Sequence, residues 1–351
     1  MDKSISVTWR SPANIALIKY WGKHDNQLPN NPSLSMTLNH SITETTVEIN
    51  PAKEPENPAI HFTFEDQPNL VFESRIKNFI HSLKEFFTFL SSNDISIKSQ
   101  NNFPHSSGIS SSASFMSSLA LCLCSVERKL SDSPMNDYDF YKKASFIARL
   151  GSGSATRSVY GGFVSWGLTN LIHDSSDEYA TPIMDNIHKV FTDYCDSVLI
   201  VSSNQKKLLS SEGHRLMETN PYNKTKYNEA GRNFGVLLDY LKKGDENGFG
   251  RIVENEAMAL HGMIFMSQPW HILMEPNTII ILDKVRKFRE INGLPICFTL
   301  DAGPNVHILY SRKIKNKIKT FIEIELNPFC ENHKWIDDCV GNGPVELKPL
   351  E

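Results

Sequence analysis

Four short stretches of the sequence combine glycines, hydroxyl groups and charged side chains in patterns that suit phosphate chemistry. The first, from Pro104 to Ala113, reads PHSSGISSSA and leads directly into a helical pattern. Its glycine lets the backbone turn closely, and serine hydroxyls with the unpaired N–H groups of a first helical turn can bind a phosphate. The alternative is a serine-rich linker that only caps the helix. The P-loop pattern G-x-x-x-x-G-K-S/T does not occur in this stretch, which argues against an ordinary P-loop NTPase.

Two further stretches add a fixed cation and a carboxylate. Gly151 to Ser158 reads GSGSATRS, and the guanidinium of Arg157 can bind a carboxylate or a phosphate through two parallel hydrogen bonds. A structural turn is the alternative for this stretch. Thr299 to Asn305 reads TLDAGPN, so Asp301 stands where a strand ends in a tight turn. It is either a turn cap or a catalytic carboxylate in a partly desolvated pocket, oriented by the rigid Gly-Pro turn.

The remaining stretch, Asn14 to His24, reads NIALIKYWGKH. Lys19 follows a largely apolar run, so it either ends a buried strand or directs its ammonium group into a cleft. In the second case Tyr20 and Lys23 could offer a hydroxyl and a second cation to the same anion. A weaker candidate is the serine pair at 210–211, whose simpler role is to cap the helix that begins there.

The elements that must position these stretches are a mixture of strands and helices. Alternation and short apolar runs predict strands at residues 7–10, 43–50, 160–167 and 197–203, with two more within 296–310. Pro12 is expected to break the first strand. Helical spacing predicts helices at 74–90, 113–126, 138–150, 206–219, 222–243, 245–261, 275–292 and 313–326. Because long charged helices dominate after about residue 195, we expect an α+β protein of two lobes, residues 1–195 and 196–351, with a cleft between them.

Composition narrows the class of protein. The chain has 351 residues, a formal net charge of -4 and 40% hydrophobic residues, which is enough apolar material for one large or two smaller domains. Charge this close to balance argues against binding of nucleic acid through an overall basic surface. No stretch approaches the roughly 18 apolar residues that a spanning helix needs, so no membrane insertion is expected. With charges at Asp2, Lys3 and Arg10 and no apolar block between them, we expect no signal peptide, reduced thiols and a cytoplasmic location.

The six cysteines give no clear metal site. Only Cys330 and Cys339 lie near a histidine, His333, and their spacing fits no common zinc template. The sequence alone therefore leaves any metal ligands unassigned.

The four stretches, in their order along the chain, resemble the signatures of the GHMP small-molecule kinase superfamily. The phrases IALIKYWGK, NNFPHSSGISSSAS, GSGSATRSVYGGFVSW and DAGPN are most similar to its diphosphomevalonate decarboxylase branch, since its kinases usually carry a run of glycines where DAGPN stands. The spacing agrees along essentially all 351 residues. The resemblance implies a two-lobed GHMP-kinase fold: an N-terminal ribosomal-protein-like α/β sandwich, a C-terminal ferredoxin-like α/β lobe and an active site in the cleft. It also implies a homodimer.

The reaction that the resemblance implies is ATP-dependent decarboxylation of mevalonate 5-diphosphate to isopentenyl diphosphate, in the mevalonate route of isoprenoid biosynthesis. Asp301 would orient or deprotonate the 3-hydroxyl and later stabilise the positive charge at C3. Arg157 would hold the C1 carboxylate in a fixed geometry, and Lys19 would lie near the transferring phosphoryl group.

The same resemblance implies two sets of binding residues. Those for the substrate are Asn14, Lys19, Tyr20, Lys23, Ser152, Gly153, Ser154, Arg157, Ser210 and Ser211, of which the last two would close the cleft. Those for the ATP phosphates, with Mg²⁺, are Pro104, Ser106, Ser107, Gly108, Ser110, Ser111 and Ser112.

Some positions depart from the family pattern. The phosphate loop usually reads Pro-Thr-Ala-Ala-Gly-Leu and here reads PHSSGI from Pro104, and Thr156 stands where a cysteine is common. Glu212 lies beside the serine pair, where bacterial relatives can carry a basic residue, and its carboxylate would repel a diphosphate unless it points away. Arg215 or the lysines at 206 and 207 would compensate.

These departures leave alternatives open. One is a related decarboxylase that acts on mevalonate 5-phosphate, and another is a mevalonate 3-kinase that stops at the phosphoester. A non-catalytic binding protein is disfavoured, because Asp301, Lys19 and Arg157 occur together.

Overall fold

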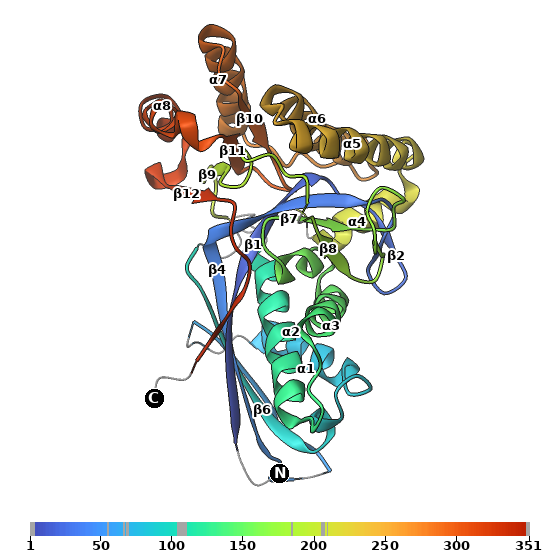
Figure 1. Ribbon diagram of the computed structural model, residues 1–351. Coiled ribbons are helices and arrows are strands. Elements are labelled where there is room, and N and C mark those ends of the chain that lie inside the picture. The colour runs from blue at the N-terminus through green and yellow to red at the C-terminus, as the bar shows by residue number, and fades with distance from the viewer. Residues whose placement is uncertain are drawn as a thin grey trace.

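The computed structural model describes residues 4–54, 56–65, 67, 70–103, 111–183, 185–204, 208 and 210–348. Strands and helices form two lobes, the lower one built on a long twisted sheet and the upper one rich in helices (Figure 1). This arrangement confirms the α+β class. None of the helices within the described ranges has the length and apolar character that crossing a bilayer requires.

The N-terminal lobe has a seven-stranded sheet in the order β13-β1-β4-β6-β5, with β7 on β4 and β8 on β7. Its strands are β1 (Ile5–Ile18), β4 (Ser33–Pro51), β5 (Ile60–Phe64), β6 (Asn93–Asn101), β7 (Phe163–Trp166), β8 (Ala180–Pro182) and β13 (Val345–Leu347). A short hairpin, β2 (Lys23–His24) and β3 (Leu28–Pro29), follows β1. Burial alternates along much of β4, as expected of an antiparallel strand with one face on the core.

Three helices cover one face of this sheet: α1 (Leu70–Ser82), α2 (Ser111–Leu130) and α3 (Asp137–Gly151) (Figure 1). The most buried of them, α2, contacts β1, β4 and α3. Their apolar side chains form one core with those of the sheet, including Val7, Val47, Leu119 and Ile147. This packing fixes the first turn of α2, at Ser111 and Ser112, where the predicted phosphate loop ends in the sequence.

Two expectations for this lobe were wrong. Pro12 does not end the first strand, because β1 runs on through it with a register shift between Pro12 and Asn14. Proline is tolerated in a sheet at such irregularities. The helix expected at 74–90 ends at Ser82, and a turn leads to a short 3₁₀ helix at Thr88–Ser91. Phe87 is fully buried after this turn, so tertiary packing overrides helical spacing.

The C-terminal lobe has a four-stranded sheet in the order β10-β11-β9-β12, and every pair is antiparallel. The strands are β9 (Cys195–Leu199), β10 (Ile296–Thr299), β11 (Val306–Tyr310) and β12 (Trp335–Cys339). With helices between β9 and β10 and between β11 and β12, this is the ferredoxin-like β-α-β-β-α-β arrangement. The helices are α4 (Ser210–Thr219), α5 (Asn223–Lys243), α6 (Glu246–Phe265), α7 (Pro276–Asn292) and α8 (Lys315–Phe321), which continues as a π-helical turn at Ile322–Leu326.

The two lobes share structure rather than only a linker. One apolar cluster joins Ile15 and Leu34 of the first lobe to Phe234 and Phe249 of the second. Near the end of the chain, β13 pairs with β1 and so returns to the first sheet (Figure 1). The strand ends that carry the predicted chemistry are therefore held together by a common core.

Candidate active site

The site begins where β1 and β10 end. Lys19 follows the last residue of β1, and Asp301 lies in the turn between β10 and β11. Lys19 Nζ donates to Asp301 Oδ1 at 3.0 Å and to the carbonyl oxygen of Ala16 at 2.7 Å. Lys19 is 3% exposed and the Asp301 side chain 24%. The fold thus brings together two charged groups that lie 282 residues apart in the sequence.

Burial and charge oppose each other at Lys19. Burial lowers the pKa of its ammonium group, the neighbouring carboxylates of Asp301 and Glu256 raise it, and Arg157 lowers it. The carboxylates of Asp301 and Glu256 thus favour the charged form of the lysine, whereas burial favours the neutral amine.

Arg157 is the second cation of the site. It lies on the 3₁₀ helix Gly153–Val159, is 2% exposed, and donates from Nη1 to Ser33 Oγ at 2.6 Å. Its guanidinium carbon lies 5.8 Å from the centre of the Trp166 ring. Among the described residues its Nε–H meets no acceptor. Burial lowers its pKa to about 10, opposed by Tyr20 and Asp301, so it remains charged at neutral pH with a donor left for an anion.

Tyr20 packs tightly against Trp166 and the glycine-serine turn. Its ring meets Trp166 edge-on at 4.7 Å, and a Cβ atom built on Gly153 would lie 2.4 Å from the Tyr20 hydroxyl oxygen. Position 153 therefore has no room for a side chain. Burial raises the pKa of the Tyr20 hydroxyl, so it is a neutral donor.

Asn14 holds the glycine-serine turn in place through two hydrogen bonds. Its Nδ2 donates to Ser158 Oγ at 2.8 Å and to the carbonyl oxygen of Ser154 at 3.2 Å. The hydroxyls of Ser152 and Ser154 lie 3.5 Å apart. Asn14 is 3% exposed, so the amide donor that was predicted to meet the substrate is used within the protein.

Lys23 lies at the other end of this segment. Its Nζ donates to Gln27 Oε1 at 2.7 Å, and partial burial lowers its pKa. Next to it, the His214 ring of α4 packs between Tyr20 and Trp21 and its Nδ1 accepts from the Gly22 N–H at 2.9 Å. Burial and the Lys23 charge lower the pKa of His214 to about 3, so the ring is neutral. His214 is a single histidine in a charged helix, and nothing in the sequence pattern around it indicates this role.

The remaining predicted residues either lie at the start of a helix or lie outside the described residues. Ser210 and Ser211 begin α4 and are both exposed, with the half-buried Glu212 beside them. In the predicted ATP loop, Ser111 and Ser112 form the first turn of α2. The rest of that loop (Pro104, Ser106, Ser107, Gly108 and Ser110) lies outside the described residues, as do the lysines at 206 and 207.

Two buried polar residues of α6 contact the ion pair and were not predicted. Glu256 is fully buried and accepts from the backbone N–H of Lys19 at 3.1 Å. His261 Nε2 donates to the carbonyl oxygen of Asp301 at 3.0 Å. A signal existed for the first, because Glu256 shares the apolar face of the helix with Val253, Ala257 and Leu260.

The described residues contain no group of three or more His, Cys, Asp or Glu side chains that could hold a metal ion. Mg²⁺ bound to a nucleotide needs few such groups, because phosphate oxygens and water supply most of its ligands.

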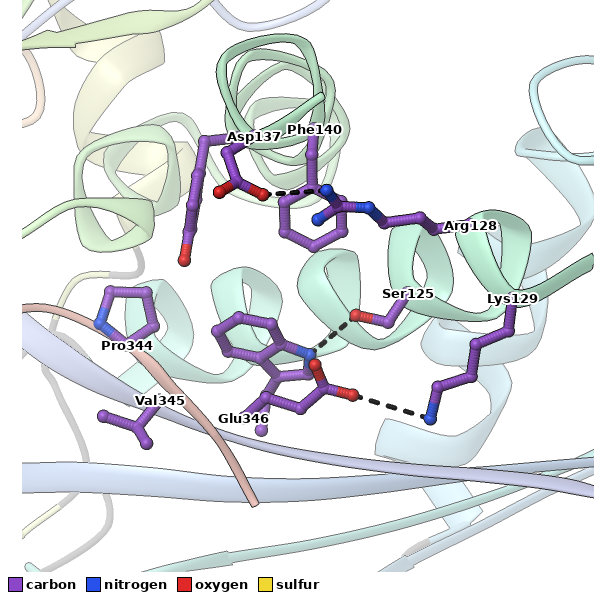
Figure 2. A pocket seen from close by; sticks show the side chains of 10 residues that line it. Ser125, Arg128, Lys129, Asp137, Phe140, Pro344, Val345 and Glu346 are labelled. Atoms are coloured by element: carbon purple, nitrogen blue, oxygen red, sulfur yellow. Dashed lines mark hydrogen bonds and ion pairs between the residues drawn. The ribbon is translucent and has the colours of Figure 1, made fainter. Parts of the chain in front are cut away.

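A cavity of about 450 Å³ lies elsewhere on the N-terminal lobe, between α2, α3 and the β1–β13 edge (Figure 2). Its charged side chains pair with each other, Arg128 with Asp137 at 2.8 Å and Lys129 with Glu346 at 3.6 Å. Trp9 in its wall precedes Lys19 by ten positions, on the order of 30 Å along the sheet. This cavity is therefore not part of the ion-pair site.

Comparison with known proteins gives consistent matches to both lobes. The model of the diphosphomevalonate decarboxylase-like N-terminal domain matches residues 11–179, and that of the mevalonate 5-diphosphate decarboxylase C-terminal domain matches residues 197–346. A diphosphomevalonate decarboxylase of Ganoderma lucidum is 30% identical, with 98% of this chain and 88% of that protein covered.

Solved structures agree with this match. A mevalonate diphosphate decarboxylase from Staphylococcus aureus superposes with a TM-score of 0.84 at 28% identity, covering 99% of both chains. A protein named MDDEF, in complex with MVAPP, AMPPCP and magnesium, superposes with a TM-score of 0.82 at 28% identity, covering 99% of this chain and 100% of that one. Because family models, a relative of similar length and whole-chain structural likeness agree, this chain belongs to the diphosphomevalonate decarboxylase family.

Proposed function

We infer that this chain catalyses the ATP-dependent decarboxylation of mevalonate 5-diphosphate to isopentenyl diphosphate, carbon dioxide, ADP and phosphate. The observation that carries this inference is the Lys19–Asp301 ion pair beside the buried guanidinium of Arg157, in a chain of this family. The substrate, nucleotide and metal classes are supported by MDDEF, which was solved with MVAPP, AMPPCP and magnesium.

Asp301 acts on the tertiary 3-hydroxyl. Its partly exposed position between a buried lysine and the solvent lets one carboxylate oxygen stay on Lys19 while the carboxylate accepts a hydrogen bond from the hydroxyl. The oxygen then attacks the γ-phosphorus of ATP, and the hydroxyl proton leaves to the carboxylate or through it to water. Lys19 neutralises charge that develops on the transferring group. Mg²⁺, when bound, neutralises charge on the nucleotide phosphates.

Arg157 acts on the opposite end of the reacting carbons. Phosphorylation turns the 3-oxygen into a leaving group, and as the C3–O bond breaks, the electrons of the C1–C2 bond form the C2=C3 double bond. Carbon dioxide leaves from C1. The Arg157 guanidinium, held by Ser33, fixes the C1 carboxylate so that the breaking bond stays aligned. The negative charge of Asp301 stabilises the positive charge that builds up at C3.

The other binding residues are assigned as the family resemblance implies them. We assign the diphosphate to Tyr20, Lys23, Ser152, Gly153 and Ser154, with Ser210 or Ser211 closing the cleft and Asn14 acting through the turn that it supports. The ATP phosphates are assigned to the loop and first helical turn at 104–112. We place the boundary between the two lobes of this site near residues 195 and 196, at the start of β9, and β13 returns to the first sheet.

We also propose a homodimer in the cytoplasm. Four side chains at the end of α6 and just after it are about half to two thirds exposed although apolar: Phe265, Met266, Trp270 and Ile272. An exposed apolar cluster of this kind suits a protein interface. The six cysteines form no disulfide, which suits a reducing compartment. A monomer in analytical ultracentrifugation at micromolar concentration would contradict the dimer.

The experiment for the function is a substrate panel. The purified protein is incubated with ATP, Mg²⁺ and mevalonate, its 5-phosphate or its 5-diphosphate, and both ADP and carbon dioxide are measured. We expect equal amounts of ADP and carbon dioxide with the diphosphate. ADP without carbon dioxide, or a preference for another substrate, would contradict the proposal.

A further inference from the structure

Helix α6 packs against the chain segments that carry both members of the ion pair. It contacts β1, which ends at Ile18 just before Lys19, and β10, which ends at Thr299 two residues before Asp301. The helix thus bridges two backbone segments whose separation sets the distance between the ammonium group and the carboxylate.

Glu256 makes the contact to the first segment. One carboxylate oxygen, Oε2, accepts from the Lys19 N–H, and the other, Oε1, accepts from Lys226 Nζ at 2.5 Å and Asn233 Nδ2 at 2.8 Å. The side chain is completely buried. Because a buried charge is costly unless it is fully paired, a structural need alone would be met more simply by an apolar residue. The Oε2 atom of Glu256 instead fixes the backbone of Lys19, the residue whose ammonium group binds Asp301.

His261 makes the contact to the second segment, five positions further along α6. Its Nε2 meets the carbonyl oxygen of Asp301, and because a carbonyl only accepts, the histidine is the donor. The ring is 8% exposed, and burial lowers its pKa to about 4, so it is neutral near pH 7. It can thus fix the Asp301 backbone without adding a charge to the site.

We propose that Glu256 and His261 are positioning residues for the Lys19–Asp301 pair, one fixing the backbone at the lysine and the other the backbone at the aspartate. This inference rests on the proposed function, since it assigns these residues to the geometry of that reaction. Neither residue is a catalytic residue, because each acts through another.

Glu256 also acts through its charge. The groups that face Lys19 are Asp301, Glu256, Arg157 and His261. Burial lowers the pKa of Lys19, and Glu256 is one of the two carboxylates that oppose this. Removing the Glu256 charge therefore lowers the pKa of Lys19 further, so the lysine loses its proton at a lower pH. Since the reaction uses the charged lysine, the alkaline limb of the kcat profile must move to lower pH.

The first test compares Glu256→Gln with Glu254→Gln. Glu254 is a matched control for charge, because it lies on the same helix and pairs with Arg289 at 2.6 Å. It also accepts from the backbone N–H of Phe298 at 3.2 Å, but it is not among the charged groups that shift the pKa of Lys19. For Glu256→Gln we expect the alkaline limb to move down by about one pH unit, with kcat lowered about 10-fold or more. The control should keep the limb of the unchanged protein. A Glu256→Gln protein with the original limb and kcat would overturn the role of Glu256.

If Glu256→Gln does not fold, the role of Glu256 is tested in the double variant Glu256→Gln with Lys226→Met. This variant leaves no unpaired buried charge. It should move the limb in the same direction, and an unmoved limb would overturn the role of Glu256.

The second test concerns His261. His261→Ala should lower kcat about 10-fold to 100-fold, while His261→Gln, whose side-chain amide can still donate to the Asp301 carbonyl, should restore it to within about 3-fold. Equal kcat in the two variants, per folded protein measured by circular dichroism, would overturn the role of His261. The unchanged protein is assayed under the same conditions in both tests. If it releases no carbon dioxide, the proposed function fails, whereas activity with unaffected variants removes only this inference.

Discussion

At the scale of single residues, the proposed chemistry depends on a few buried groups that keep a hydrogen-bond donor for the substrate. Arg157 is 2% exposed and its Nε–H meets no acceptor among the described residues. A lysine at this position would keep the charge but lose the forked geometry that holds a carboxylate by two bonds. We expect Arg157→Lys to lower the rate of carbon dioxide release about 100-fold. A rate within about 3-fold of the unchanged protein, in a variant with the same melting temperature, would argue against contact with the carboxylate.

At Gly153 the prediction depends on the space available for a side chain and not on charge. A Cβ atom there would lie 2.4 Å from the Tyr20 hydroxyl and 2.9 Å from Cη2 of Trp166, so one of these rings has to move. Gly153→Ala should therefore lower kcat/KM about 10-fold or more by displacing Tyr20 and the turn.

Gly231 provides the control for this variant. It lies within α5 and a Cβ atom there would meet nothing within 4 Å. Gly231→Ala should leave kcat/KM unchanged and raise the free energy of unfolding slightly, because alanine suits a helix better than glycine. Equal kinetics in the two variants would show that position 153 tolerates a side chain.

The residues of the site were only partly predictable from the sequence. Lys19 and Asp301 are charged residues that follow apolar residues at the ends of predicted strands, and this pattern made them candidates. The structure places their side chains in contact, and their catalytic roles are still predictions. His214 and His261 lie within helices, where a polar residue gives no signal until its tertiary neighbours are known. Glu256 did carry a signal, its place on the apolar face of α6.

At the scale of elements, β12 is tied to the first sheet by one buried carboxylate. Asp338 accepts from the backbone N–H groups of Asn39, His40 and Ser41, each at 2.8 Å, and from the Ser41 hydroxyl at 2.7 Å. Asp338→Ala leaves these donors without their acceptor, so we expect it to lower the free energy of unfolding by about 3 kcal/mol. Urea unfolding followed by tryptophan fluorescence measures this.

The neighbouring acid, Asp337, is a suitable control. It pairs with Lys315 at 3.0 Å and Lys319 at 2.6 Å near the surface, where ion pairs contribute little. Asp337→Ala should cost less than about 1 kcal/mol. Similar losses in both variants would mean that Asp338 does not join the two sheets in the way described.

The long helices of the second lobe were predicted well from their spacing. The structure has α5, α6 and α7 within a few residues of the expected ranges, because an amphipathic helix against a sheet preserves its apolar period. Strands β5 and β6 had no prediction. In β6 the face toward the helices carries Ile95 and Ile97 but also Ser99, so the alternation is weak.

At the scale of the whole molecule, catalysis requires that both lobes present their strand ends to one place. The shared apolar cluster around Ile15, Leu34, Phe234 and Phe249 holds them there. No local pattern in the sequence specifies this contact, because it depends on packing between segments 200 or more residues apart. The resemblance to a family supplied the arrangement that periodicity could not.

The measurement that tests the account most directly is turnover by Asp301→Asn. The two side chains are nearly isosteric, so the change removes the negative charge that meets Lys19, and that we propose acts on the 3-hydroxyl, while leaving the shape of the site. We expect no detectable carbon dioxide from mevalonate 5-diphosphate, with nucleotide affinity within about 3-fold of the unchanged protein, because general-base and electrostatic help are both lost. Substantial turnover by this variant would contradict the central role given to Asp301.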